Sequence, residues 1–193
     1  AAAETGALGL QRIDDPPRAL VAAAGHQHLA RAPLTSDRAA ALQQAREPLA
    51  RRPVQRRRDG TLVYQWHHLD KVYDSLLALG LKPFVELNPM PAALASGPDT
   101  MFYYKMNITP PRDWSEWFDL VRAFTAHCVE RYGLPEVRQW QFEVWNEPNL
   151  SGFWSGTKEE YFRLYAHAAR AVKSVDSKLK IGGPASSKAH WLN

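Results

Sequence analysis

Apolar side chains recur at helical spacing in three stretches of the chain after residue 60. In each stretch the apolar positions repeat at intervals of three and four residues, which predicts a helix with one buried face. Two of the stretches open with the pattern of a capping box, in which an N-cap side chain is followed three residues later by Glu. The predicted helices cover residues 68–79, residues 113–133 with Asp113 and Glu116 at their start, and residues 161–175 with Thr157 and Glu160 before them.

Three short apolar runs, at residues 82–87, 141–146 and 180–182, alternate with these helices. This order predicts an α/β fold in which parallel strands are joined by right-handed helical crossovers. A closed barrel and an open doubly wound sheet both satisfy it. No glycine-rich phosphate loop follows any of the runs, which weakens the nucleotide-binding version of the sheet. Residues 88–111 form a long irregular stretch, and loops of that length usually serve function or are mobile.

The composition of residues 1–60 differs from that of the rest of the chain. All 21 aromatic residues lie after residue 60, while residues 1–60 hold ten arginines and six acidic residues. A segment without aromatic side chains buries little apolar area, so ordering its backbone is poorly offset. We therefore predict two parts. Residues 1–60 are an irregular, basic, Ala/Arg/Pro-rich segment that is disordered or arises from coding DNA read out of frame, and residues 61–193 are the ordered domain.

The remaining composition argues against several classes of partner and cofactor. The arginines between residues 51 and 58 come without aromatic stacking residues, so we do not expect nucleic-acid binding. No apolar run approaches the roughly 20 residues that a membrane-spanning helix needs, so no membrane association is expected. Cys128 is the only cysteine and is predicted to pack as a small hydrophobic residue. No His or Cys spacing suggests a metal site, and no organic cofactor is expected.

The segment FEVWNEPNLSGFW at residues 142–154 holds the strongest candidates for catalytic residues in the sequence. Glu147 stands where a strand must end, because Pro148 cannot donate to a sheet ladder. In parallel α/β folds the C-terminal ends of strands carry the reactive groups. A carboxylic acid placed there can donate a proton to a leaving oxygen. Asn146 can donate and accept hydrogen bonds beside it.

The aromatic residues around Glu147 allow two interpretations. Trp145, Phe153 and Trp154 offer flat apolar surfaces that pack on the C–H side of a sugar ring. Alternatively, Glu147 only caps a backbone turn and Trp154 only fills the core. Both interpretations follow from the residues alone.

The motif WNEPN after a strand, with PFVEL, MPAALASG, NITPP and GGPA in the family's order, resembles glycoside hydrolase family 39, and within it the bacterial β-xylosidases. The likeness runs from Asp59 to Asn193. It implies a retaining glycosidase with a (β/α)8 fold, of which this chain would form a partial TIM barrel. Residues 82–87, 141–146 and 180–182 would then be barrel strands three, four and five.

The resemblance also implies roles for individual residues. Glu147 matches the general acid/base, and Asn146 the residue that hydrogen-bonds the sugar beside the cleaved bond. Trp145 is expected to contact the substrate, and the expected site border is the loop that holds Phe102, Tyr103 and Tyr104. The carboxylates of Glu86 and Glu143 are expected to be hydrogen-bonded inside the barrel. The nucleophile in this family is a Glu on strand seven, so no residue of this chain is assigned to that role.

The implied substrate is a xylose-containing oligosaccharide, hydrolysed from its non-reducing end. Because retaining hydrolysis needs a second carboxylate, this chain is expected to be an incomplete piece that is inactive alone. The alternatives are a non-catalytic sugar-binding or assembly fragment and a hydrolase resembling α-L-iduronidase. The resemblance suggests a bacterial cytoplasmic or periplasmic location and leaves the oligomeric state open.

Overall fold

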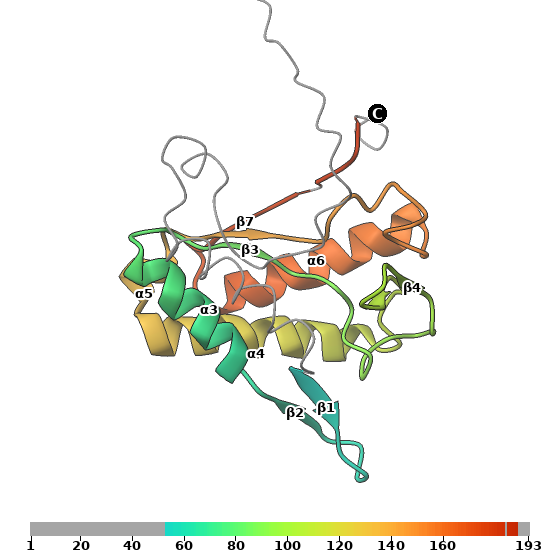
Figure 1. Ribbon diagram of the computed structural model, residues 1–193, viewed down its shortest axis with the longest axis horizontal. Coiled ribbons are helices and arrows are strands. Elements are labelled where there is room, and N and C mark those ends of the chain that lie inside the picture. Colours follow the sequence, from blue (N-terminus) through green and yellow to red (C-terminus); the bar gives the residue numbers. More distant parts are fainter. Residues whose placement is uncertain (1–52, 184, 189–193) are drawn as a thin grey trace, which may run out of the picture.

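A three-stranded parallel sheet forms the centre of the fold. The computed structural model describes residues 53–183 and 185–188, so what we predicted for residues 1–52 lies outside its described part. The strands lie in the order β3 (Phe84–Glu86), β6 (Gln141–Glu143) and β7 (Lys180–Gly182), and each follows one of the helices α3 (His67–Ala78), α4 (Trp114–Tyr132) and α6 (Lys158–Val175). Both strand pairs are parallel. The predicted α/β fold with parallel strands and helical connections is confirmed (Figure 1).

The two faces of this sheet have different surroundings. In Figure 1 the helices α3, α4 and α6 lie together below the sheet. Val85 and Phe142, at the centres of β3 and β6, are buried in the core that these helices share with the strands. Because side chains alternate along a strand, Glu86 and Glu143 project from the opposite face, where the register sets them side by side.

Aromatic side chains are the largest ones in the core. Six of its twelve largest fully buried side chains are aromatic: Trp140, Trp145, Trp154, Tyr73, Tyr161 and Phe142. Each such residue removes 150–250 Å² from water, roughly, so a few of them stabilise a small domain substantially. Cys128 is also fully buried, as predicted, and burial raises the pKa of its thiol well above the usual range.

The helix starts agree with one of the two predicted capping boxes. Thr157 and Glu160 form a reciprocal capping box at the start of α6. At α4, Asp113 accepts a hydrogen bond from the backbone N–H of Ser115, and Glu116 does not complete a box. Glu116 is instead held by the Arg56 guanidinium, so the prediction at α4 was wrong because an ion pair from elsewhere in the chain takes this side chain. No helix in the described part is both long and apolar enough to cross a membrane.

An antiparallel hairpin precedes α3. It pairs β1 (Val54–Arg56) with β2 (Leu62–Tyr64). Both terminal nitrogens of Arg56 donate to the Glu116 carboxylate at 2.7 Å, which ties the hairpin to α4. The domain boundary predicted at residue 60 falls inside this hairpin.

The long stretch after β3 is not wholly irregular. It contains a second hairpin, formed by β4 (Thr100–Met101) and β5 (Met106–Asn107). Asn107 is buried and fixes this stretch internally, since its side chain donates to the Gly97 carbonyl and accepts from the Thr109 backbone N–H. A short helix, α5 (Leu134–Val137), lies between α4 and β6 and was not predicted.

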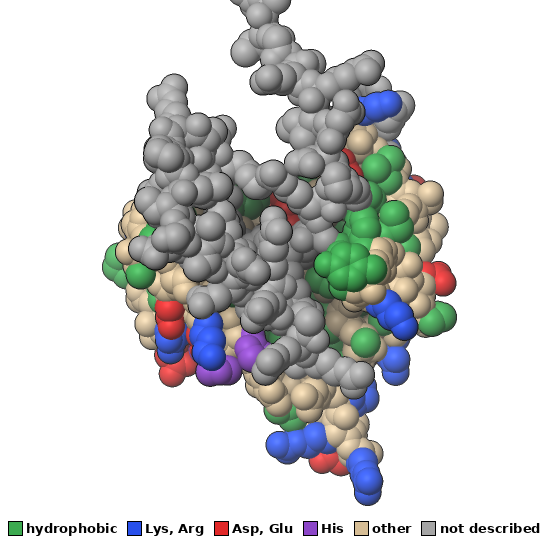
Figure 2. Space-filling model, viewed as in Figure 1, with side chains coloured by type: hydrophobic (Ala, Val, Ile, Leu, Met, Phe, Trp, Pro, Cys, Tyr) green, Lys and Arg blue, Asp and Glu red, His purple; other side chains and the backbone are tan. Residues whose placement is uncertain are grey.

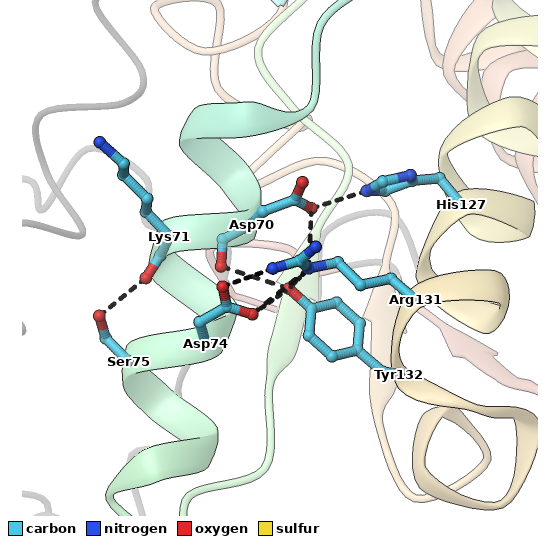
Figure 3. Close-up of polar contacts among 7 residues, drawn as sticks. All are labelled: Asp70, Lys71, Asp74, Ser75, His127, Arg131 and Tyr132. Atoms are coloured by element: carbon cyan, nitrogen blue, oxygen red, sulfur yellow. Dashed lines mark hydrogen bonds and ion pairs between the residues drawn. The ribbon is translucent and has the colours of Figure 1, made fainter.

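A polar cluster joins α3 to α4 on the surface of the core (Figure 3). Asp70 on α3 lies 2.6 Å from Nε2 of His127 and 3.7 Å from the Arg131 guanidinium on α4. Arg131 and the Tyr132 hydroxyl also both reach Asp74, one turn further along α3. Since these partners come from two helices 57 or more residues apart in sequence, the cluster fixes how the helices sit against each other.

We expect Asp70→Ala to lower the free energy of unfolding by about 1–2 kcal/mol, because it leaves the partly buried His127 without its partner and removes one of the two carboxylates near the exposed Arg131. Urea titration followed by circular dichroism measures the change. The control is Lys71→Ala, at the exposed neighbouring position on α3. Equal effects of the two variants would contradict a stabilising role for the cluster.

Candidate active site

The C-terminal ends of the three parallel strands meet at one edge of the sheet. Strand β6 ends at Glu143, three residues before its predicted end. Beyond it, Trp145 and Glu147 adopt left-handed backbone conformations, with φ of 66° and 46°. Such conformations cost about 1–3 kcal/mol for residues other than glycine and persist only where the surroundings enforce them. The chain therefore turns sharply here, directly at the edge where reactive groups gather in parallel α/β folds.

Hydrogen bonds to the segment after β7 hold this turn in place. The backbone N–H of Glu147 donates to the Ala185 carbonyl at 2.8 Å. The side chain of Asn149 donates to the Ser187 carbonyl at 2.6 Å and accepts from the Ser187 N–H at 2.8 Å. The loops that follow two neighbouring strands thus form one unit around Glu147.

Glu147 and Asn146 lie next to each other and are both half-buried. This position suits side chains that must meet a ligand and still be held by the fold. The local turn is closed by the backbone carbonyl of Glu147, which accepts from the Leu150 N–H at 3.0 Å, so it does not require the carboxylate. The structure brings the predicted acid and the predicted amide together; their roles remain predictions.

Trp145 lies below the turn rather than at its surface. Its side chain is fully buried, its indole N–H donates to the Phe153 carbonyl at 2.8 Å, and its ring meets that of Trp154 edge-on at 5.0 Å. A ring with no exposed face cannot stack on a sugar, so our expectation that Trp145 contacts the substrate was wrong. Trp145 instead packs in the core beneath the turn. Trp154 is likewise buried and fills the core, as one of the two interpretations held.

The predicted aromatic loop lies at the tip of the β4–β5 hairpin. Phe102 stacks on Tyr104, with ring centroids 5.2 Å apart, and meets the ring of Phe153 edge-on at 5.6 Å. Phe153 belongs to the loop after β6, so the structure brings the aromatic hairpin to the loop that carries Glu147. Tyr103 is 96% exposed, and its ring meets that of Tyr104 edge-on at 5.1 Å.

Glu86 and Glu143 form a carboxyl pair on the sheet face opposite the helices. The two residues are register partners on β3 and β6. Burial, and then the charge of Glu143, raise the pKa of Glu86 to about 8. Burial also raises the pKa of Glu143. We had expected carboxylates hydrogen-bonded inside a barrel, and the structure adds that one member of the pair retains its proton near neutral pH.

We expect Glu86→Gln to stabilise the folded chain at pH 8 and to have little effect at pH 4. An unfolded Glu loses its proton near pH 4.5 and folded Glu86 near pH 8, so the carboxyl group destabilises the fold progressively as the pH rises through this window. The gain from the neutral amide should reach about 4 kcal/mol at pH 8. Thermal unfolding from pH 4 to 8 measures it.

The matched control is Glu130→Gln on the exposed side of α4. It should change stability little. A gain from Glu86→Gln that is the same at pH 4 and pH 8 would contradict the shifted titration of Glu86.

In residues 53–183 and 185–188 no group of three or more His, Cys, Asp or Glu side chains is arranged to hold a metal ion. A pocket of about 270 Å³ opens beside β7, where Glu143 and three lysines, Lys173, Lys178 and Lys180, are among its lining residues. Glu147 does not line this pocket, so the pocket and the candidate acid are separate features.

Comparison with known proteins identifies the family. The model of glycosyl hydrolases family 39 matches residues 49–193, most of the chain. The chain belongs to this family. The match begins before the hairpin β1–β2, so the family likeness includes residues that we had placed in the N-terminal segment.

Individual relatives agree with this assignment. A β-xylosidase from Caldicellulosiruptor saccharolyticus is 53% identical over 135 residues, which are 69% of this chain and 28% of that protein. A human α-L-iduronidase is 34% identical over 128 residues, covering 65% of this chain and 18% of that protein. The crystal structure of a monomeric β-xylosidase from Caulobacter crescentus superposes with a TM-score of 0.71 at 42% identity, covering 82% of this chain and 35% of that one. The chain thus spans about a quarter of the length of the β-xylosidases it matches.

Proposed function

We propose that this chain carries the acid/base half of a β-xylosidase active site. The observation that carries the proposal is the half-buried Glu147–Asn146 pair at the C-terminal end of β6, in a family 39 chain that is 53% identical to a β-xylosidase. The substrate class is a xylose-containing oligosaccharide. A function like that of α-L-iduronidase is less well supported, because the identity to that enzyme is 34% over a similar length.

We further propose that the sheet is part of the wall of a (β/α)8 barrel. The strands are adjacent in the order of the sequence, and their helices lie on one side of the sheet (Figure 1). A doubly wound sheet needs a reversal of strand order and helices on both faces, whereas a barrel has all its helices outside. The face with Glu86 and Glu143 would be the barrel interior, and Glu147 would stand at its rim.

In the proposed reaction Glu147 acts twice. It first protonates the glycosidic oxygen while a second carboxylate attacks the anomeric carbon, and the resulting carboxylate then takes a proton from the water that releases the sugar. We assign the attacking carboxylate to none of the described residues. Asn146 would hydrogen-bond the sugar beside the cleaved bond, and the hairpin with Phe102, Tyr103 and Tyr104 would border the site.

A chimera tests the proposal with a complete barrel. The segment of the C. saccharolyticus β-xylosidase that matches this chain is replaced by this chain's own residues. We expect the chimera to hydrolyse xylobiose and Glu147→Gln to lower kcat/KM by about 100-fold or more, because proton transfer to the leaving oxygen is lost. With an activated aryl β-xyloside, azide should restore turnover of this variant and give β-xylosyl azide, since azide attacks without a general base.

The control is Glu159→Gln, at an exposed position in the first turn of α6, which should keep full activity. Azide that fails to rescue Glu147→Gln would show that Glu147 is not the acid/base. A folded chimera that binds xylose without turnover would support a sugar-binding fragment instead. Hydrolysis of an aryl α-L-iduronide in preference to the xyloside would contradict the proposed β-xylosidase function and support one like that of α-L-iduronidase.

A further inference from the structure

The side-chain amide of Asn88 lies unpaired at the edge of the sheet where the candidate site is found. Asn88 lies two residues after the end of β3, and neither its amide nitrogen nor its amide oxygen, both shielded from solvent, has a hydrogen-bond partner among the described residues. Buried amide groups in proteins are almost always paired, because leaving them unpaired is costly. An unpaired donor and acceptor on one side chain therefore call for a ligand or a bound water.

The position of Asn88 connects it to the candidate site. The ladder between β3 and β6 continues through the Leu87 N–H, which donates to the Glu143 carbonyl at 2.8 Å. Continuing this register sets residue 88 opposite residue 145, one position before Asn146. The Asn88 side chain lies near the Glu86 carboxyl, so it is on the side of the sheet that holds Glu86 and Glu143 rather than on the helix-covered side.

The neighbouring carboxyl group does not satisfy the amide. The Asn88 side chain is close enough to Glu86 to oppose part of the rise in the pKa of that carboxyl. Neither amide atom, however, reaches hydrogen-bonding geometry with it. The residue as a whole is only half-buried, so it lies near the surface of the fold, although its two amide atoms are shielded.

We propose that Asn88 is a sugar-binding residue whose amide hydrogen-bonds a hydroxyl group of the pyranose ring held by Asn146 and Glu147. A ring hydroxyl both donates and accepts, so it matches the free donor and acceptor of the amide. This inference rests on the proposed function, because it assumes that a sugar occupies the edge beside Glu147. It adds a sugar-binding residue from the loop after β3 to a site whose proposed acid and amide come from the loop after β6.

The test compares affinity with stability in the 193-residue chain, using xylobiose as the probe. We expect Asn88→Ala to weaken xylobiose binding about tenfold in a calorimetric or NMR titration, because one hydrogen bond to the sugar is lost. The same variant should keep or raise the melting temperature, since the amide has no partner in the fold to lose. Asn88→Ser, which retains a hydroxyl group, should bind with intermediate affinity. Gln55→Ala, at an exposed amide on β1, is the control and should change neither property.

A second measurement uses the wild-type chain alone. The side-chain amide signals of Asn88, assigned by their absence from the spectrum of Asn88→Ser, should shift when xylobiose is added. If xylobiose moves the Asn146 amide but not the Asn88 amide, or if Asn88→Ala binds as tightly as wild type, the role of Asn88 is refuted while the proposed site stands. A bound water as the true partner would give this same result. If the wild-type chain binds no xylobiose, sugar binding by this chain fails, and the inference about Asn88 with it.

Discussion

The pairing of β6 with a parallel strand on each side is the constraint on which the rest of the structure depends. Its register with β3 sets Glu86 beside Glu143, and its pairing with β7 brings the segment that follows β7 under the Glu147 turn. Parallel strands deliver their C-terminal ends to one edge, so residues far apart in the sequence converge there without any contact of their own. A change of register by one residue would turn Glu143 toward the helices and bring Phe142 out of the core.

Aromatic packing gives this edge its rigidity. Trp145 and Trp154 form a buried floor directly below the turn, and the indole N–H of Trp145 is satisfied by the backbone of the same loop. A left-handed Glu147 is tolerated because the chain on both sides of it is held, by the buried Trp145 before it and by the Asn149–Ser187 hydrogen bonds after it. The backbone strain at Glu147 is thus balanced by packing and hydrogen bonding on both sides of the turn.

Much of the fold could be predicted because the helices and strands carry their own periodic signal. The helix order, the parallel sheet, the capping box at Thr157 and the buried Cys128 follow from spacing and residue type. The errors arose where a distant residue intervened. Arg56 takes Glu116 away from the start of α4, and the hairpins before α3 and after β3 are built from strands of two or three residues, too short for a periodic pattern.

By itself, the sequence determined that Asn146 and Glu147 follow a strand of an α/β fold, since a proline after a strand and the motif around it are local properties. Tertiary structure alone decided which aromatic rings are available. It buries Trp145 completely, sets Phe102 against Phe153 and leaves Tyr103 exposed. It also decided that Glu86 and Glu143 become neighbours and that the Asn88 amide stays unpaired. Burial and hydrogen-bond pairing depend on which segments pack together across long stretches of chain. A local sequence pattern does not predict those contacts.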